Sequence, residues 1–399
     1  MTQAVILAAG KGTRLQPLTL TKPKVLLKVA GKTLLQHNLE QLEGLADEVI
    51  VVVGYLGQQI RDALGQRFGK LRLRYVEQRV QDGSGGALLA CRGLLHGRFL
   101  VFNGDDLYSK EDIRRCLRHP QAVLAKEVPD PQNWGNLSVR GGCVSRFEEK
   151  PKQPKSGLAN VGLYVFDEGI FAHRLRKSSR GELEITDYLA FLLQQKKEVR
   201  CELVRDYWLP VGYPWHLLEA NAFLLRRIEK QRVAGVVEDG AVLSGAVVIG
   251  EGSVIRRGTV IEGPAVIGEG CTLGPNCFIR GPVTLGNNCR IGHAVEIKDV
   301  VIGDNTSVPH LSYIGDSVLG DRINLGAGTI TANLRFDHGE VKTIVNGRRV
   351  SSGRKKLGAV IGDGAQTGIH VSLMPGVRVW PDVCIAPGTV VSRDSTDTK

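Results

Sequence analysis

The 399-residue sequence lacks the usual signatures of a membrane or secreted protein. It has no apolar run of about 18 residues, so we expect no transmembrane helix. Its first residues carry no charged stretch ahead of a long apolar run, so we expect no signal peptide. Its eight cysteines are scattered and form no C-x-x-C pair, which argues against a disulfide framework and a structural zinc site. The sequence therefore predicts a cytoplasmic protein.

The sequence also lacks the charge pattern of a nucleic-acid-binding protein. Its net charge is +11, but the basic residues are dispersed and no DNA- or RNA-binding motif is present. Phosphorylated small substrates explain the same excess of positive charge. We therefore expect small-molecule partners, and neither nucleic acid nor a membrane.

The N-terminal stretch LAAGKGTRLQPLTL, residues 7–20, lacks the two common phosphate-binding templates. A Walker A motif is G-x-x-x-x-G-K-[ST], whereas Lys11 follows Gly10 directly. A Rossmann fingerprint has a third glycine where this chain has Leu15. Small residues after an apolar strand still let backbone N–H groups approach an anion, and Lys11 and Arg14 add positive charge. The stretch therefore predicts a strand-loop phosphate site of another kind.

Two regions with different periodicities follow one another along the chain. Up to about residue 232, strand-like apolar runs alternate with helical segments, which predicts an α/β domain with a largely parallel sheet. The stretch 214–232 then reads as a long amphipathic helix that begins at a proline. The strand candidates are QAVIL, DEVIVVV, LRLRYVE, RFLVFN and VGLYVF, and the helix candidates include TLLQHNLEQLEGL and GALLACRGLL.

From residue 233, aliphatic residues recur every six positions. This period is typical of a parallel β-helix, whose coils stack one aliphatic side chain at each corner. A Gly-rich β-sandwich would alternate every two residues and does not fit. The rhythm slips by one at Ile302 and at Leu319 and resumes near Ile361. The unbroken series is Val237, Leu243, Ile249, Ile255, Ile261, Ile267, Leu273, Ile279, Leu285, Ile291 and Ile297.

The first region resembles the sugar-1-phosphate nucleotidylyltransferases over roughly residues 1–225. The resemblance rests on LAAGKGTRL, TKPK, QRVQDGSGGAL, NGD, NWGNL, FEEKP and NVGLYVF, in that order. It implies a loop around a nucleoside triphosphate, in which Arg14 steadies the leaving pyrophosphate and Lys24 reaches the phosphates. The implied nucleotide-binding residues are Leu7, Ala9, Gly10, Gly12, Thr13, Gln78, Gly83 and Ser84.

The same resemblance implies a metal ligand and a sugar site. Asp105 would hold Mg²⁺, a hard cation that prefers carboxylate oxygen. Glu149 would grip sugar hydroxyls and Lys150 the sugar phosphate, with Gly135 and Asn160 beside them. The sugar phosphate then attacks the α-phosphorus in line, without a protein nucleophile.

One position departs from this family's pattern. Its members commonly carry an aspartate in W-x-D-x-G as a second metal ligand, and the corresponding stretch here is YWLPVGYPW, with Pro210 at that place. Proline cannot bind a metal. Asp206 lies nearby in the sequence, as a candidate ligand or as a turn residue.

The second region resembles the acetyltransferase half of the bifunctional UDP-N-acetylglucosamine pyrophosphorylase/glucosamine-1-phosphate N-acetyltransferase family, especially its archaeal members. The resemblance rests on HLSYIGDSVLGDRINLGAGTITANLRFD, residues 310–337, and on SSGRKKLG. It implies an α/β Rossmann-like nucleotidyltransferase domain at residues 1–232 and a left-handed parallel β-helix at 233–399. It further implies acetyl-CoA and UTP as co-substrates, Mg²⁺ as cofactor, and a homotrimer.

The resemblance assigns the general base of acetyl transfer to His310, since an imidazole can take the proton of the attacking amine near neutral pH. Arg280 and Lys298 would hold the sugar phosphate. Leu334 stands where bacterial members have a tyrosine, so the sequence leaves glucosamine, galactosamine or both as substrates. The implied substrate-binding residues are Arg280, Lys298, Tyr313, Asn324, Asn333 and Lys342. The insertion after Leu334 either meets the phosphates of CoA or forms a solvated loop, and its basic residues include Arg348, Arg349, Arg354, Lys355 and Lys356.

Two other functions fit the same sequence. The first is a glucose-1-phosphate nucleotidylyltransferase that uses dTTP or UTP, with a β-helix that only oligomerises. Gln78 and Gly83 suit uracil and thymine equally. The second is a regulatory subunit with a decayed nucleotidyl site, which Pro210 favours.

Overall fold

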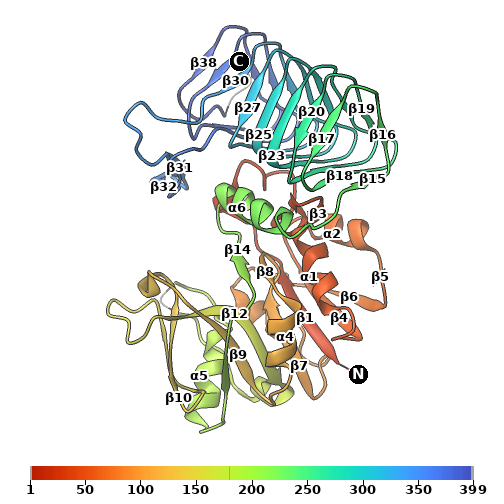
Figure 1. The fold of residues 1–399 in the computed structure, drawn as a ribbon. Helices are drawn as coiled ribbons and strands as arrows, with labels where there is room; N and C mark the ends of the chain where they lie inside the picture. Colours follow the sequence, from red (N-terminus) through yellow and green to blue (C-terminus); the bar gives the residue numbers. More distant parts are fainter. Residues whose placement is uncertain (1, 179, 397–399) are drawn as a thin grey trace. The chain divides into compact units, whose positions relative to one another are not determined.

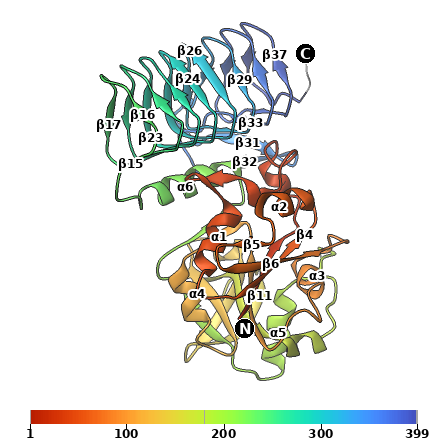
Figure 2. The same cartoon turned by 90° about the vertical axis from the view of Figure 1, so that its right-hand side faces the viewer.

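A computed structural model describes residues 2–178 and 180–396 (Figure 1; Figure 2). The chain divides into two compact units. The first comprises Met1–Lys11 and Leu34–Pro210, and the second comprises Gly12–Thr33 and Val211–Lys399. Gly12–Thr33, here called the signature segment, therefore groups with the C-terminal region although it lies near the start of the sequence.

A ten-stranded sheet forms the centre of the first unit. The predicted parallel pairs are present, because β1 lies between β4 and β7 and β4 also pairs with β6. β12, however, runs antiparallel between β7 and β9, so the sheet is mixed and the prediction of a largely parallel sheet was wrong. In sheet order the strands are β10 (Gly135–Arg140), β11 (Cys143–Glu149), β13 (Arg200–Leu203), β9 (Ala122–Glu127), β12 (Leu158–Asp167), β7 (Arg98–Asn103), β1 (Gln3–Ala8), β4 (Glu48–Val53), β6 (Leu71–Glu77) and β5 (Arg67–Phe68).

The central strand β4 has the sequence EVIVVV and is buried at every position. A strand covered on both faces is expected to be such an unbroken apolar run, because β-branched side chains fit a pleated surface. The short strands β8 (Asp106–Tyr108) and β14 (Trp208–Pro210) pair antiparallel outside the main sheet. The helices of this unit are α1 (Leu34–Leu42), α2 (Gly57–Leu64), α3 (Ser84–Leu89), α4 (Lys110–Cys116), α5 (Thr186–Gln194), and the 3₁₀ turns Pro131–Asn133 and Glu168–Ala172.

The second unit contains parallel strands that repeat coil after coil, as a β-helix requires (Figure 2). Hydrogen bonds join neighbouring coils at a separation of 18 residues before the predicted slip at Ile302 and 17 residues across it. In the last coils the separation is again 18, as between Val360 and Arg378. The predicted aliphatic series from Ile249 to Ile297 lies in one buried cluster. The six-residue period therefore marks the positions that face this core.

The described strands of the second unit fall into two large sheets and two two-stranded pairs, β2–β3 and β31–β32. The first sheet contains β15 (Arg232–Val233), β17 (Val242–Ser244), β18 (Val247–Ile249), β20 (Val260–Glu262), β21 (Ala265–Ile267), β23 (Phe278–Leu285), β25 (Glu296–Ile302), β27 (Tyr313–Gly315), β28 (Val318–Leu319), β30 (Ile330–Thr331), β33 (Val360–Ile361), β35 (Ser372–Leu373), β36 (Arg378–Val379) and β38 (Val390–Val391). The second contains β16 (Val236–Val237), β19 (Val254–Ile255), β22 (Thr272–Leu273), β24 (Arg290–His293), β26 (Ser307–His310), β29 (Asn324–Leu325), β34 (Gln366–Thr367) and β37 (Cys384–Ile385).

The predicted insertion after Leu334 leaves the coils and forms a hairpin of β31 (Lys342–Val345) and β32 (Arg348–Ser351). The coil stack continues beyond it, because Asp321 donates its backbone N–H to Asp363 across 42 residues. The signature segment holds two 3₁₀ turns, Thr13–Leu15 and Lys24–Leu26, and the pair β2 (Lys28–Val29) and β3 (Lys32–Thr33).

The predicted long helix 214–232 is shorter than expected. Helix α6 spans Pro214–Leu225. The chain then makes a turn, in which the N–H of Ile228 donates to the carbonyl of Leu225. Strand β15 follows and pairs with β18 of the coils. The strand pairing of Arg232 and Val233 overrides the helical propensity of the preceding residues. Among the described residues, no helix has the length and apolar character of a bilayer span.

The buried series predicts a steep cost for emptying a coil. Ile297 is fully buried in the aliphatic cluster, whereas Ile344 in the hairpin is 46% exposed. Ile297→Ala should lower the free energy of unfolding of the second unit by about 2–5 kcal/mol, through lost burial and the cavity left behind. Chemical denaturation at fixed protein concentration measures it. Ile344→Ala is the matched control, with a loss within about 1 kcal/mol, and equal losses in the two variants would contradict the assignment of the core.

Candidate active sites

The signature segment brings two predicted phosphate ligands together. Gly12 has a left-handed backbone with φ of 62°. A Cβ on Gly12 would lie 3.1 Å from Cβ of Lys24 and 3.2 Å from Cγ2 of Thr19. Thr19 donates its hydroxyl to the carbonyl oxygen of Gly12 at 2.9 Å. The glycine is therefore required by both its φ angle and the close approach of the buried stem of Lys24.

Arg14 follows on the first 3₁₀ turn and is exposed. Its guanidinium lies 5.2 Å from the ring centroid of Tyr213, and Tyr213 stacks on Trp215. Cation–π contact of this kind orients an arginine without neutralising it. The sequence analysis quoted Tyr213 within YWLPVGYPW but assigned it no role, because nothing in the pattern linked it to Arg14. The neighbouring Thr13 accepts a 3.4 Å hydrogen bond from the amide of Asn346.

In the first unit, the end of β1 lies beside the NGD turn. The carbonyl of Leu7 accepts the N–H of Gly104 at 2.9 Å, and Leu7 is in register with Asn103. The carbonyl of Ala9 accepts the N–H of Tyr55. Gly10 is exposed, and a Cβ there would meet nothing within 4 Å. The structure therefore brings the predicted residue Leu7 next to the turn that carries Asp105.

The predicted nucleobase segment is held in place by its own hydrogen bonds. The Gln78 amide nitrogen donates to Oδ1 of Asp82 at 3.1 Å and to the carbonyl of Gly83 at 2.9 Å. Ser84 Oγ accepts the backbone N–H of Ile185. Gly83 has φ of 111°, and a Cβ there would lie 2.4 Å from the carbonyl oxygen of Leu183. Both amide hydrogens of Gln78 are thus in use, while its Oε1 accepts no hydrogen bond from a described residue.

Asp105 lies in the turn between β7 and β8. The side chain of Asn38 donates to the carbonyls of Gly104 and Asp106 on either side of it, at 3.3 and 2.8 Å, which fixes the turn. Across the β8–β14 pair, Pro210 lies opposite Asp106. The departure at Pro210 therefore falls beside the candidate metal ligand.

Asp206 occupies a different environment. Its backbone N–H donates to Oδ2 of Asp112 at 3.1 Å, and the carbonyl of the next residue, Tyr207, accepts the backbone N–H of Ser109. It thus precedes β14, whereas Pro210 ends that strand. The structure separates Asp206 from the position that the family pattern uses.

A pocket of ≈ 330 Å³ in the first unit contains two predicted sugar ligands, Glu149 and Lys150. Arg180, another lining residue, lies 3.3 Å from Glu149 and 2.7 Å from Glu184. Gly135 pairs with Glu149 across β10 and β11, and a Cβ there would crowd the side chain of Phe147 at 2.8 Å. The sequence gave no signal for Arg180, which comes from a segment without a recognised motif.

Burial raises the pKa of the Glu149 carboxyl, and the nearby positive charges of Arg180 and Lys150 offset part of that rise. Asn160 is not among the lining residues of this pocket. Its amide donates to the hydroxyl of Tyr164 at 2.7 Å and its oxygen accepts the N–H of Gly162 at 3.1 Å. In the described structure Asn160 therefore shapes an irregular stretch of β12.

In the second unit, His310 ends β26 and is exposed. Its ring has no hydrogen-bond partner among residues 2–178 and 180–396. The chain bends just after it, where the hydroxyl of Ser312 donates to the carbonyl of His310 at 2.7 Å, and β27 begins at Tyr313. His310 is in register with His293 of the preceding coil. An unpaired imidazole at a coil edge is available to accept a proton from a substrate.

A polar cluster surrounds three of the other predicted residues. Lys298 Nζ contacts Oδ2 of the buried Asp316 at 3.1 Å. Asn333 donates to the same oxygen at 2.6 Å and to the Tyr313 hydroxyl at 3.0 Å. Asp316 thus joins Lys298, Tyr313 and Asn333, and the sequence analysis missed it because it reads as one more coil-turn aspartate.

Arg354 from the predicted basic insertion joins this cluster. It contacts Asp299 at 2.7 Å and Asp316 at 3.6 Å. Burial raises the pKa of Asp299, and the charge of Arg354 lowers it in part. Arg280 lies one coil away from Lys298 in the same register and pairs with Glu296.

Two predicted residues lie apart from this cluster. Asn324 pairs with Ser307, three residues before His310, so the two lie roughly 10 Å apart along the strand direction. Lys342 lines a pocket of ≈ 260 Å³ with Arg335 and Arg349. Arg348, Lys355 and Lys356 are exposed.

The N-terminal sheet and the motifs around it define a nucleotidyltransferase, because residues 3–227 match the "Nucleotidyl transferase" family model. Residues 261–355 match the "GMPPB C-terminal domain" model. The chain belongs to the family of bifunctional GlmU proteins, which are sugar-1-phosphate nucleotidylyltransferases and acetyltransferases. It is therefore an enzyme of the transferase class.

The similarity extends over the whole chain. The bifunctional protein GlmU of Methanocaldococcus jannaschii is 41% identical over 98% of this chain and 95% of its own. The bifunctional sugar-1-phosphate nucleotidylyltransferase/acetyltransferase of Sulfurisphaera tokodaii is 36% identical over 98% of both chains. A solved structure from Bacillus anthracis, described as a glucose-1-phosphate thymidylyltransferase, is similar with a TM-score of 0.52 and 27% identity, covering 58% of this chain and 98% of that one.

The raised pKa of Glu149 predicts a stability cost at neutral pH. An unfolded glutamate has a pKa of about 4.3, so the folded state binds the carboxyl proton of Glu149 more tightly than the unfolded state does. The protonated carboxyl therefore stabilises the folded state at low pH, and this stabilisation is lost as the pH rises through the folded pKa. Glu149→Gln should therefore melt at a higher temperature than the parent at pH 7–8, with the difference vanishing near pH 4. It should also raise KM for the sugar phosphate.

Thermal unfolding monitored at several pH values measures this difference. Glu148→Gln is the control, because Glu148 does not line the pocket. A Glu149→Gln variant that melts no higher than the parent at pH 7–8 would show that the carboxylate carries no such cost.

Proposed function

We propose that the enzyme acetylates glucosamine-1-phosphate with acetyl-CoA and then joins N-acetylglucosamine-1-phosphate to UTP, releasing pyrophosphate. One observation carries this proposal: the imidazole of His310 is exposed and has no hydrogen-bond partner among the described residues. It lies at the coil edge from which the chain runs on to Tyr313 and the Lys298–Asp316–Asn333 cluster. A β-helix that served only for assembly would need no buried carboxylate with three polar partners.

The nucleotidyl step requires positive charge around the triphosphate. An oxygen of the sugar phosphate attacks the α-phosphorus of UTP, the bond to the β-phosphate oxygen breaks, and pyrophosphate departs. We assign Arg14 to the developing charge on pyrophosphate and Lys24 to the phosphates, because both side chains come from the signature segment. Leu7, Ala9, Gly10, Gly12 and Thr13 would line the loop, and Glu149, Lys150, Gly135 and Asn160 would bind or shape the sugar site.

Asp105 would hold Mg²⁺ in this step. Among the residues that the structure describes, no group of three or more His, Cys, Asp or Glu side chains could enclose a metal. Mg²⁺ is usually held by one or two carboxylates together with substrate phosphates, so a single carboxylate in a fixed turn fits this ion. The bound ion would neutralise charge on the phosphates.

Gln78 supports a uracil or thymine base. Its amide hydrogens are committed to Asp82 and Gly83, so the group it offers is the acceptor Oε1. Uracil and thymine carry an N3–H donor, whereas cytosine presents an acceptor there. With Gly83 and Ser84 shaping the segment, we expect UTP or dTTP to bind and CTP to be rejected.

In the acetyl step, the amine of glucosamine-1-phosphate attacks the thioester carbonyl of acetyl-CoA. His310 takes the amine proton as the N–C bond forms, and the C–S bond then breaks to release the CoA thiolate, which receives that proton. Arg280 and Lys298 would hold the sugar phosphate, and Tyr313 and Asn333 the sugar. Lys342 would add positive charge for CoA.

His310 and Asn324 are both assigned to the acetyl-transfer site, but they lie roughly 10 Å apart along the strand direction within one chain. This separation supports a site to which more than one copy of the chain contributes. We propose a left-handed β-helix at residues 233–399 after a nucleotidyltransferase domain at 1–232, a homotrimer, and a cytoplasmic location. Several aliphatic side chains of the coils are exposed in the single chain, as an interface between copies would require. They include Val236, Val242, Ile330 and Val390.

His310→Ala should lower acetyl transfer by at least about 100-fold, because removing a general base costs that order of rate. Pyrophosphate release from UTP and N-acetylglucosamine-1-phosphate should stay at the parent rate. Release of free CoA thiol measures the first activity. His293→Ala is the matched control, since His293 lies in register on the preceding coil and is also exposed. Unchanged acetyl transfer in His310→Ala would favour an assembly-only β-helix.

Pro210→Asp should lower the Mg²⁺ concentration that gives half-maximal pyrophosphate release. Residue 210 lies opposite Asp106 and beside the turn that bears Asp105, so a carboxylate there adds an oxygen ligand. Titration of the initial rate with Mg²⁺ measures the shift. Pro210→Asn, which removes the ring without adding charge, is the control. An identical Mg²⁺ dependence in all three proteins would contradict a metal position beside residue 210.

A further inference from the structure

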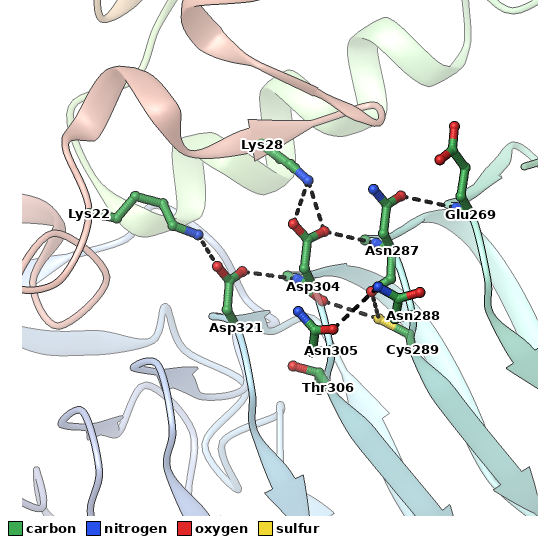
Figure 3. Close-up of polar contacts among 12 residues, drawn as sticks. Lys22, Lys28, Glu269, Asn287, Asn288, Cys289, Asp304, Asn305, Thr306 and Asp321 are labelled. Atoms are coloured by element: carbon green, nitrogen blue, oxygen red, sulfur yellow. Dashed lines mark hydrogen bonds and ion pairs between the residues drawn. The ribbon is translucent and has the colours of Figure 1, made fainter. Parts of the chain in front are cut away.

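Polar side chains at one turn of successive coils form a ladder along the second unit (Figure 3). Oδ1 of Asn287 accepts the N–H of Glu269 at 3.0 Å, and Oδ1 of Asp304 accepts the N–H of Asn287 at 2.8 Å. Asp321 and Asp363 continue the pattern, at 2.9 and 2.8 Å. One oxygen of each side chain is therefore used to tie its coil to the one before.

The second oxygen of three ladder members binds the signature segment. Lys28 Nζ contacts both carboxylate oxygens of Asp304, at 2.8 Å from Oδ1 and 2.7 Å from Oδ2, and Lys22 Nζ forms an ion pair with Oδ2 of Asp321 (Figure 3). The hydroxyl of Thr21 donates to Oδ2 of Asp363 at 2.8 Å. These contacts join residues about 280 to 340 positions apart in the sequence.

Asn287 indicates that the ladder does not need a carboxylate. Its amide oxygen satisfies the ladder hydrogen bond, and its amide nitrogen makes no hydrogen bond to a described residue. The acidic character of the other members is therefore explained by what lies outside the ladder. Burial raises the pKa of Asp304, but the hydrogen bonds from Lys28 and Asn287 outweigh it, and the net pKa is lowered, so the carboxylate is ionised at neutral pH.

The anchored residues lie close in the sequence to the two cations that we assign to the triphosphate. Lys22 and Lys28 stand on either side of Lys24, which begins the second 3₁₀ turn. Arg378 of the coils, almost fully buried, donates to the carbonyl of Gln16 at 2.9 Å, two residues after Arg14. The segment is thus tied to the coils on both sides of Lys24 and on the C-terminal side of Arg14.

We infer that Asp304 and Asp321 are positioning residues for nucleotidyl transfer, although they belong to the acetyltransferase region. They hold Lys28 and Lys22, and through them fix Lys24 on its turn. Phosphoryl transfer depends on the position of such cations, and misplacement by about 1 Å can cost on the order of 100-fold in rate. This inference rests on the proposed nucleotidyl activity of the signature segment.

The test uses Asp304→Asn and Asp321→Asn in the full chain. Asparagine keeps the ladder acceptor Oδ1, as Asn287 does, and removes the negative charge by replacing the outer oxygen with an amide donor that repels the lysine. At residue 304 the contact of Lys28 with Oδ1 is the one that remains, without the charge of the carboxylate. The double variant should lose about 10-fold or more in kcat/KM for pyrophosphate release, with acetyl transfer within about twofold of the parent. Asp382→Asn is the matched control, because Asp382 lies on the next coil after Asp363 and is exposed.

Lys28→Met extends the test into a cycle. Combined with Asp304→Asn it should cost no more than either change alone, because both remove one interaction. Additive losses, or variants with parental rates, would overturn the inference. So would a parallel loss of acetyl transfer, which indicates damage to the coils.

Amide hydrogen exchange separates this inference from the proposed function. Exchange over Gly12–Thr33 should speed up in the double variant and stay unchanged in Asp382→Asn. If the parent protein released no pyrophosphate, the proposed function would fail, and the exchange result alone would decide whether these carboxylates anchor the segment. Parental exchange in the double variant would overturn the anchoring.

Discussion

The structure depends on the double use of carboxylates at one turn of the coil stack. Asp304, Asp321 and Asp363 each accept a backbone N–H of the neighbouring coil through Oδ1 and bind the signature segment through Oδ2, and at Asp304 Lys28 contacts Oδ1 as well. A coil stack has a regular spacing, so a side chain repeated at one turn produces a row of acceptors. The signature segment of the N-terminal region is held by that row.

This arrangement explains why the division of the chain into compact units differs from its division by activity. The family motifs separate a nucleotidyl region from an acetyltransferase region, whereas the contacts assign Gly12–Thr33 to the coils. Arg14 and Lys24, which we propose bind the phosphates, thus lie on a segment that is held by residues of the acetyltransferase region. A bifunctional chain of this kind gains more from fusion than shared expression, because one region supplies structural support for the other.

Much of the fold follows from local patterns. The runs LRLRYVE and RFLVFN became β6 and β7 with the predicted limits, because β-branched and aromatic residues bounded by turns specify strands. The hexapeptide series marked the core of the coils residue by residue. The length of helix α6 was overestimated, because the pairing of β15 with β18 is an interaction between separate segments that helical propensity cannot reveal.

The candidate sites were predictable where a motif carried them and not elsewhere. Gly12 and Lys24 stand in known motifs, and the structure brings them together. Asp316 lies in the quoted stretch 310–337, but its partners Lys298, Asn333 and Arg354 are not apparent from the sequence. Arg180 lies outside the quoted motifs. The acidic residues of the ladder look like ordinary coil turns in the sequence, and only the presence of Lys22 and Lys28 beside them gives them a further meaning.

The most direct measurement is a single-pot reaction of the purified protein with glucosamine-1-phosphate, acetyl-CoA, UTP and Mg²⁺, followed by separation of the nucleotide products. The account predicts that UDP-N-acetylglucosamine forms, with one CoA and one pyrophosphate released per product, and that omission of acetyl-CoA abolishes this product. Pyrophosphate release that does not depend on acetyl-CoA, without CoA release in its presence, would contradict a bifunctional enzyme and leave a nucleotidylyltransferase with a structural β-helix.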